Sequence, residues 1–284
     1  CGIRNTKKGE MLEDIYTYND FNHIGNNAGL ENPRKVAPGY VPYLVTEHNG
    51  HVFPTKKTDS ESRRTEHAMR HMNVIDAAYS NRRISGAIGW CLADYNTHIQ
   101  FGSNDRICYH GVLDIFRLPK YASYAYRAQS EGEPFIEAAS NLIAGDRSDS
   151  KLTETILFTN CEMVKLYIND DFVDDYYPDT DAYPDLPHPP IIIDDLIGEL
   201  LMKEEAYTPG QAKKLTRLLV SFNLHGFAMP LFDKIAFGWM LMTKKVTMDE
   251  VVKLYEKYIA HQIDAPVRFK FVGYKDDQPV VERT

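Results

Sequence analysis

Glu47 is the residue whose type and position are best suited to chemistry. It follows Pro42 to Thr46, a mostly apolar run typical of a strand buried on both faces. A carboxylate at the end of such a strand is held rigidly while its side chain faces a ligand. The polar residues that follow it closely are His48, Asn49, His51 and Lys56. This cluster favours a functional loop; the alternative is a solvated loop glutamate beside the start of a helix.

Strands and helices alternate around Glu47. Strands are predicted at 14–21, 42–46 and 84–92, and helices at 60–80 and 119–129. This order is typical of a parallel α/β barrel, whose functional residues lie at the carboxyl ends of the strands. Roughly three such units fit before residue 130, and a closed barrel needs about eight. Residues 1–130 are therefore predicted to form the C-terminal portion of a (β/α)8 TIM barrel.

A different pattern follows Ser130. Segments 134–140 and 155–168 alternate polar and apolar residues, as in an antiparallel sheet, and Asn169 to Asp171 can form a hairpin turn. A strand is also predicted at 267–274. Helical patterns occupy 194–205, 209–224, 234–242 and 248–259. We therefore predict that residues 131–284 form a β-sandwich domain with a helical insertion at about 190–260.

Pro42 to Gly50 (PYLVTEHNG) and Ile88 to Tyr95 (IGWCLADY) resemble active-site strands of glycoside hydrolase family 2. Pro42 to Gly50 (PYLVTEHNG) resembles the nucleophile strand, where a glutamate follows a small hydroxyl or thiol residue; His48 departs from the usual aromatic residue after it. Ile88 to Tyr95 (IGWCLADY) looks like the last barrel strand, where the family places a tryptophan at the sugar site. Trp90 and Asp94 match this pattern.

Other segments extend the resemblance. Asn104 to Gly111 is similar to the β-galactosidase segment that closes the pocket beside a monovalent cation, but His110 stands where an asparagine is usual. A monovalent or divalent cation is thus possible but not indicated, and we predict no cofactor. Asp14 to Asn19 resembles the strand before the nucleophile strand. Thr159 to Asn169 resembles the immunoglobulin-like domain that follows the barrel, so the predicted β-sandwich is of that type.

The resemblance implies a retaining glycosidase with Glu47 as the nucleophile. Such enzymes need two carboxyl groups about 5 Å apart. The family supplies the second from an Asn-Glu pair on an earlier strand, and nothing here corresponds to it. We therefore expect a fragment, inactive alone, of an enzyme that cleaves terminal β-galactosides or similar neutral β-glycosides, with the missing N-terminal part as its partner. The implied or possible sugar-binding residues are Asn19, His51, Trp90, Asp94 and His110.

Two alternatives remain open. A β-glucuronidase of the same family would bind the sugar carboxylate with an Asn-x-Lys motif, but Cys108 and His110 occupy the matching positions. A noncatalytic carbohydrate-binding or assembly module would explain the missing acid/base residue. Cys1 at the start could also suggest an N-terminal-nucleophile amidase or a processed lipoprotein, but Gly2 to Asn5 offer no supporting pattern, and a fragment or processed product is the simpler interpretation.

Composition restricts the partners. The net charge of −8 and the lack of a Lys/Arg run argue against nucleic acid, and no apolar stretch reaches the roughly 20 residues of a membrane span. The four cysteines lack metal or disulfide spacing, which fits a cytoplasmic protein. Because an incomplete barrel exposes strand edges, a homo-oligomer is possible.

Overall fold

The computed structural model of the chain describes residues 14–21, 30–37, 41–49, 53–99, 104–140, 142, 154–243, 245–260 and 267–284. They fall into two compact units. The N-terminal unit comprises the chain up to Gly132 with residues 158–160 and 179–190; the C-terminal unit comprises 133–157, 161–178 and 191–284. Sheets and helices are both present, so the predicted mixed α/β content is confirmed.

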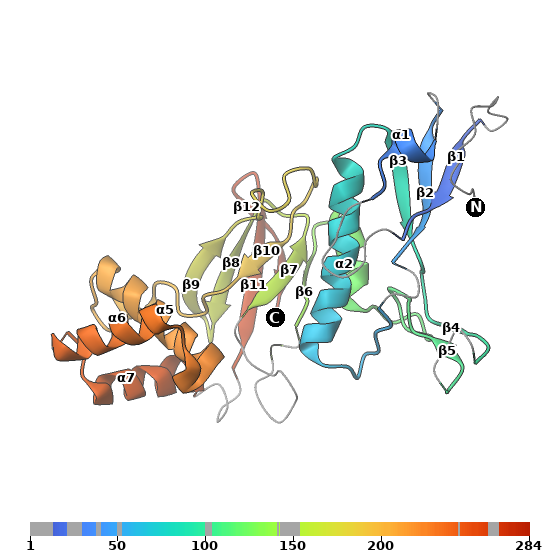
Figure 1. The fold of residues 1–284 in the computed structure, drawn as a ribbon. Coiled ribbons are helices and arrows are strands. Elements are labelled where there is room, and N and C mark those ends of the chain that lie inside the picture. Colours follow the sequence, from blue (N-terminus) through green and yellow to red (C-terminus); the bar gives the residue numbers. More distant parts are fainter. Residues whose placement is uncertain are drawn as a thin grey trace. The chain divides into compact units, whose positions relative to one another are not determined.

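A parallel sheet forms the centre of the N-terminal unit (Figure 1). Its strands β1 (Tyr16–Asn19), β2 (Tyr43–His48) and β3 (Ile84–Gly89) lie in that order, and both neighbouring pairs are parallel. The three predicted strands and their parallel direction are therefore observed, although β3 ends at Gly89 instead of residue 92. The apolar runs are explained by burial: Tyr43 and Val45 of β2 are inaccessible to solvent.

Helices α2 (Glu61–Tyr79) and α3 (Tyr121–Ala128) pack against each other, and α2 also contacts β3. Ser60 caps α2 by accepting a hydrogen bond from the backbone nitrogen of Arg63, as its position before the helix predicts. The buried face of α2 is not purely apolar, because it includes His67 and His71. The remaining elements of this unit are α1 (Pro33–Val36), β4 (Tyr95–Asn96) and β5 (Ile107–Cys108).

Antiparallel sheets organise the C-terminal unit. One has the order β12-β11-β8-β9 and the other β10-β7-β6. The hairpin between β8 and β9 turns at Asn169 and Asp170, both at positive φ, so the predicted turn is confirmed. The predicted strand 155–168 is two strands. The bounds are β6 (Ile136–Ala138), β7 (Thr155–Thr159), β8 (Met163–Ile168), β9 (Asp171–Tyr176), β10 (Ile191–Ile193), β11 (Phe269–Lys275) and β12 (Gln278–Arg283).

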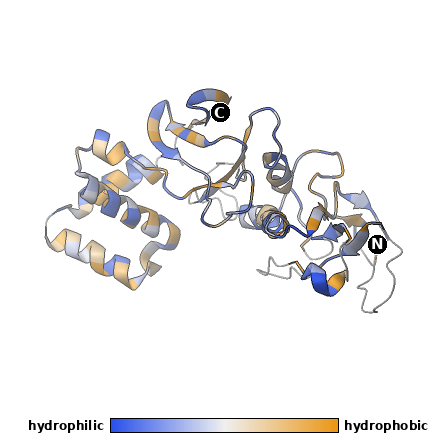
Figure 2. Cartoon of the chain, turned by 90° about the horizontal axis from the view of Figure 1, so that it is seen from above, coloured by the Kyte–Doolittle hydropathy of each residue, from blue (hydrophilic) through white to orange (hydrophobic). Residues whose placement is uncertain are grey.

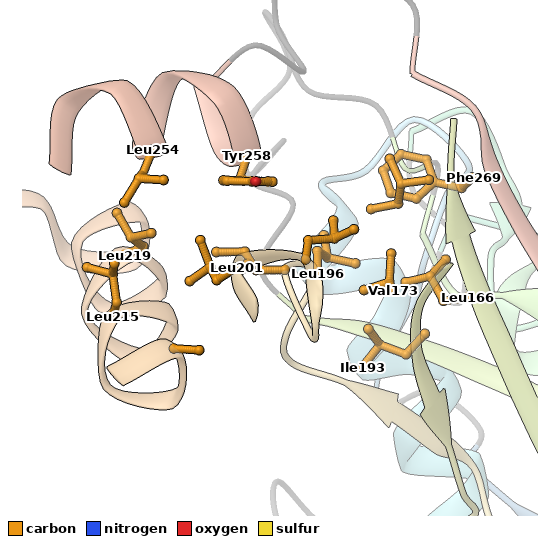
Figure 3. Close-up of a cluster of buried hydrophobic side chains, with 14 of the residues drawn as sticks. Leu166, Val173, Ile193, Leu196, Leu201, Leu215, Leu219, Leu254, Tyr258 and Phe269 are labelled. Atoms are coloured by element: carbon orange, nitrogen blue, oxygen red, sulfur yellow. The ribbon is translucent and has the colours of Figure 1, made fainter. Parts of the chain in front are cut away.

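The helices of this unit lie between β10 and β11 in the sequence and alternate hydrophobic and hydrophilic residues (Figure 2). The helices share one hydrophobic core with both sheets of this unit. In this core Leu201, Leu215 and Leu254 of the helices join Leu166 of β8 and Ile193 of β10 (Figure 3). The helices are α4 (Leu200–Lys203), α5 (Pro209–His225), η1 (Gly226–Ala228), α6 (Leu231–Met242), α7 (Met248–Tyr255) and η2 (Glu256–Ala260). No helix among the described residues is long and apolar enough to cross a membrane.

Candidate active site

The ends of the three parallel strands bring Asn19, Glu47 and Trp90 to the same edge of the sheet. Asn19 pairs with Glu47 in the register of β1 and β2, and Trp90 directly follows β3. The backbone oxygen of Glu47 accepts a hydrogen bond of 2.9 Å from the backbone nitrogen of Asp20. Glu47 itself is half-buried. A carboxylate and an aromatic ring are thus held at the strand ends, the place predicted from the sequence.

The side chain of Asn19 is hydrogen bonded to β2. Its Oδ1 accepts a hydrogen bond of 2.8 Å from the hydroxyl of Thr46. Because the carbonyl side of the amide braces β2, the amide NH2 group is the part left for a sugar hydroxyl. The proposed sugar contact of Asn19 stays a prediction.

Trp90 is fixed by its backbone and by a neighbouring ring. Its backbone nitrogen donates a 2.7 Å hydrogen bond to the backbone oxygen of His48, which ties the end of β3 to the end of β2. Its indole meets Tyr95 edge to face, with ring centroids 6.0 Å apart. The indole is half-buried, so one part of this apolar ring remains accessible for stacking on a sugar.

Asp94 lies in a buried ionic network. Its Oδ1 is 2.7 Å from Nζ of Lys120 and accepts from the backbone nitrogen of Gly111 at 2.9 Å. Lys120 also donates to the backbone oxygen of Thr55 at 2.7 Å. Burial raises the pKa of Asp94 and lowers the pKa of Lys120, and the ion pair opposes both shifts. The network joins the loops that follow β2 and β3, so the observed contacts of Asp94 hold the loop of the site together.

His110 is buried beside Cys108, and the two side chains hydrogen bond to each other. Nδ1 of His110 is 2.8 Å from Sγ of Cys108. These are the positions where the β-glucuronidase motif would place Asn and Lys.

The last predicted residue, His51, lies outside the described residues. No cluster of His, Cys, Asp or Glu that could hold a metal occurs in the part of the chain that the structure describes.

No protein-family model matches the chain. A β-galactosidase from Thermoanaerobacterium thermosulfurigenes is 50% identical over 198 residues, which cover 68% of this chain and 28% of that enzyme. A β-galactosidase from Thermoanaerobacter pseudethanolicus is 44% identical over 192 residues, covering 66% of this chain and 25% of that enzyme. The chain is homologous to part of these β-galactosidases. The predicted resemblance to the β-galactosidases of glycoside hydrolase family 2 is therefore confirmed.

The chain spans about a quarter of the length of the curated relatives it matches. A solved β-glucuronidase from glycoside hydrolase family 2 shares 16% sequence identity with this chain, with a TM-score of 0.48. That alignment covers 99% of this chain and 22% of the solved one.

Sequence reasoning missed one group of polar residues. His48 of β2, His71 of α2 and Tyr126 of α3 are joined by hydrogen bonds behind the strand end that carries Glu47. Two signals pointed to them. His48 departs from the aromatic residue usual at its position, and His67 and His71 are spaced to share one face of a predicted helix. The partner Tyr126, far along the chain, carried no such signal.

Proposed function

We propose that this chain is the nucleophile-bearing part of a retaining family 2 glycoside hydrolase that cleaves terminal β-galactosides or similar neutral β-glycosides. The observation that carries the proposal is the position of Glu47 and Trp90 at the ends of adjacent parallel strands, which are tied by the backbone hydrogen bond from Trp90 to His48. The homology to curated β-galactosidases supports the choice of substrate class.

In the proposed reaction, the Glu47 carboxylate attacks the anomeric carbon while a second carboxylic acid protonates the leaving oxygen. Water activated by that second group then attacks the glycosyl-enzyme ester and releases Glu47. Trp90 would stack on the sugar, and Asn19, His51, Asp94 and His110 would contact the sugar or hold the loops around it. The second carboxyl group would come from a part of a longer polypeptide, because the matched relatives extend far beyond the aligned region.

The proposed architecture follows from this assignment. Residues 1–130 would be the C-terminal portion of a TIM barrel, and residues 131–284 an immunoglobulin-like β-sandwich with a helical insertion at about 190–260. The parallel order β1-β2-β3 and the antiparallel order β12-β11-β8-β9 support the two parts. Among the described strands, β1 and β3 are the edges of the parallel sheet, and these edges would be available to the missing barrel strands or to a second copy of the chain.

A neutral sugar is favoured over a glucuronide by Cys108 and His110. These positions would hold the residues that bind a sugar carboxylate in the β-glucuronidase branch. Their side chains are instead buried and hydrogen bonded to each other. Comparing galactoside and glucuronide turnover by the complete polypeptide tests this choice; faster glucuronide turnover would contradict it.

The central experiment is covalent labelling of the complete polypeptide with a 2-fluoro-β-galactoside, followed by peptide mass spectrometry. The expected label lies on Glu47. A label on another carboxylate would overturn the assignment, and failure to bind covalently would favour a noncatalytic carbohydrate-binding module. The isolated 284-residue chain should show no turnover above its Glu47→Gln control, since it lacks the second carboxyl group.

A further inference from the structure

A chain of four hydrogen-bonded side chains lies behind the end of β2. Nδ1 of His48 is 2.9 Å from Oδ1 of Asn49, and Nε2 of His48 is 3.3 Å from the hydroxyl of Tyr126. The same hydroxyl is 2.8 Å from Nδ1 of His71. His48 and His71 are fully buried. The chain therefore links β2 to both helices, α2 and α3, in a place shielded from water.

The contacts define where each proton lies. In a neutral His48, Nδ1 carries the hydrogen because Oδ1 of Asn49 only accepts, and this leaves Nε2 of His48 as an acceptor. Tyr126 then donates to Nε2 and accepts from Nδ1–H of His71. Burial raises the pKa of Tyr126, so its hydroxyl stays protonated and can donate. For neutral histidines, this order gives each of the three contacts one donor and one acceptor.

The same chain is fitted closely to β3. A Cβ atom added at Gly89 would lie 2.2 Å from the Tyr126 hydroxyl and 3.2 Å from Nδ1 of His71. Gly89 pairs with His48 across the sheet and immediately precedes Trp90. The absence of a side chain at Gly89 is thus what lets the Tyr126 hydroxyl reach the two strand ends.

An irregularity in β2 lies directly beside this contact. The register of β2 against β3 shifts between Val45 and His48, which are both buried, whereas Thr46 and Glu47 between them are half-buried. Such irregularities redirect side chains and are frequent beside active sites. His48 is therefore the residue at which the pairing of β2 with β3 resumes after Glu47.

We infer that His48 and Tyr126 are positioning residues that set the direction of the Glu47 carboxylate relative to Trp90. The side chain of His48 is held by Tyr126, and its backbone oxygen holds the nitrogen of Trp90. One buried ring thus couples the attacking group to the sugar platform. This inference rests on the proposed function of Glu47.

The test compares Tyr126→Phe with Tyr124→Phe in the complete polypeptide. Both variants lose one hydroxyl on α3, but only Tyr126 bonds to His48. Misplacement by a fraction of an ångström should lower kcat and the rate of 2-fluoro-galactoside labelling at Glu47 by about tenfold to a hundredfold for Tyr126→Phe. KM should change less than kcat, and Tyr124→Phe should behave as wild type. His48→Phe, which keeps a ring without the hydrogen bond, should show the same split if Tyr126→Phe does not fold.

The outcomes separate the inference from the proposed function. Wild-type labelling at a residue other than Glu47 would overturn both. Labelling at Glu47 with an unchanged rate in folded Tyr126→Phe and His48→Phe would overturn the positioning role alone. Nitrogen-15 NMR of histidine in the 284-residue chain gives an independent reading, because it should find the Nδ1–H tautomer of His48. An Nε2–H tautomer would contradict the proton order.

Discussion

The ammonium of Lys120 lies 2.7 Å from the carboxylate of Asp94, and both side chains are almost completely buried, with 4% and 2% of their surface exposed. Charges removed from water in this way depend on each other, because either one alone would be left without compensation. The pair joins α3 to the loops after β2 and β3. Substitution of either partner in this ion pair should therefore disturb the loops that surround the candidate active site.

Lys120→Met should destabilise the N-terminal unit by about 3–5 kcal/mol, since it leaves the Asp94 carboxylate buried and unpaired. Lys57→Met is the matched control, because the Lys57 ion pair with Asp114 is at 3.5 Å and partly exposed, and its loss should cost less than about 1 kcal/mol. The measurement is urea unfolding followed by Trp90 fluorescence in a Trp239→Phe background, which leaves one tryptophan, in this unit. Equal costs for the two variants would contradict the prediction.

Gly89→Ala should cost about 1–3 kcal/mol, because its Cβ would lie 2.2 Å from the Tyr126 hydroxyl. Gly86→Ala in the same strand should cost less, since the nearest atom is Cδ1 of the flexible Leu44 side chain at 3.1 Å. Adding Tyr126→Phe should relieve part of the Gly89→Ala cost by removing the clashing oxygen. Strictly additive free energies in this double-mutant cycle would show that the two residues do not meet.

His67 predicts how stability depends on pH. Burial, aided by positive charges that include Lys120, lowers its pKa from 6.5 to about 3. The folded state therefore binds fewer protons than the unfolded state between these values. Its contribution to stability is fully present above pH 6.5 and is lost as the pH falls towards 3, by about 1.4 kcal/mol per unit. His67→Leu should flatten the pH dependence of unfolding between about pH 6 and 4. Met72→Leu, which changes a buried residue of the same helix without removing a titratable group, should retain the wild-type slope.

The sequence was sufficient for the elements that carry local signals. The buried run before Glu47 predicted β2, and Ser60 before an amphipathic segment predicted the start of α2. The sequence was less informative where the backbone conformation of one residue interrupted an expected helix. The helix expected at 194–205 shrinks to α4, because Gly198 adopts a positive φ of 50° that a continuous helix cannot accept.

The acidic segment after the turn of the hairpin shows a second limit of prediction from the sequence. No strand was predicted at residues 171–176, which include three aspartates, yet these residues form β9, with Val173 buried in the core. Lys165 on β8 pairs with Asp175 at 2.8 Å and explains how the charge is tolerated. The contact between His48 and Tyr126 could not be predicted at all, because 78 residues separate the two in sequence and the hydrogen bond exists only once α3 packs behind β2.

The last prediction concerns Glu47 in the complete polypeptide. Glu47→Ala should abolish covalent labelling by a 2-fluoro-galactoside, because the attacking carboxylate is gone. The vacancy would still face the anomeric carbon, with the second carboxyl group and Trp90 in place. Added azide should therefore enter from the side of Glu47 and yield an inverted glycosyl azide, since a single displacement replaces the usual two. Glu47→Gln should not be rescued equally, because its amide fills the space. If Glu47 only braces its loop, Glu47→Ala would instead lose thermal stability and form no azide product.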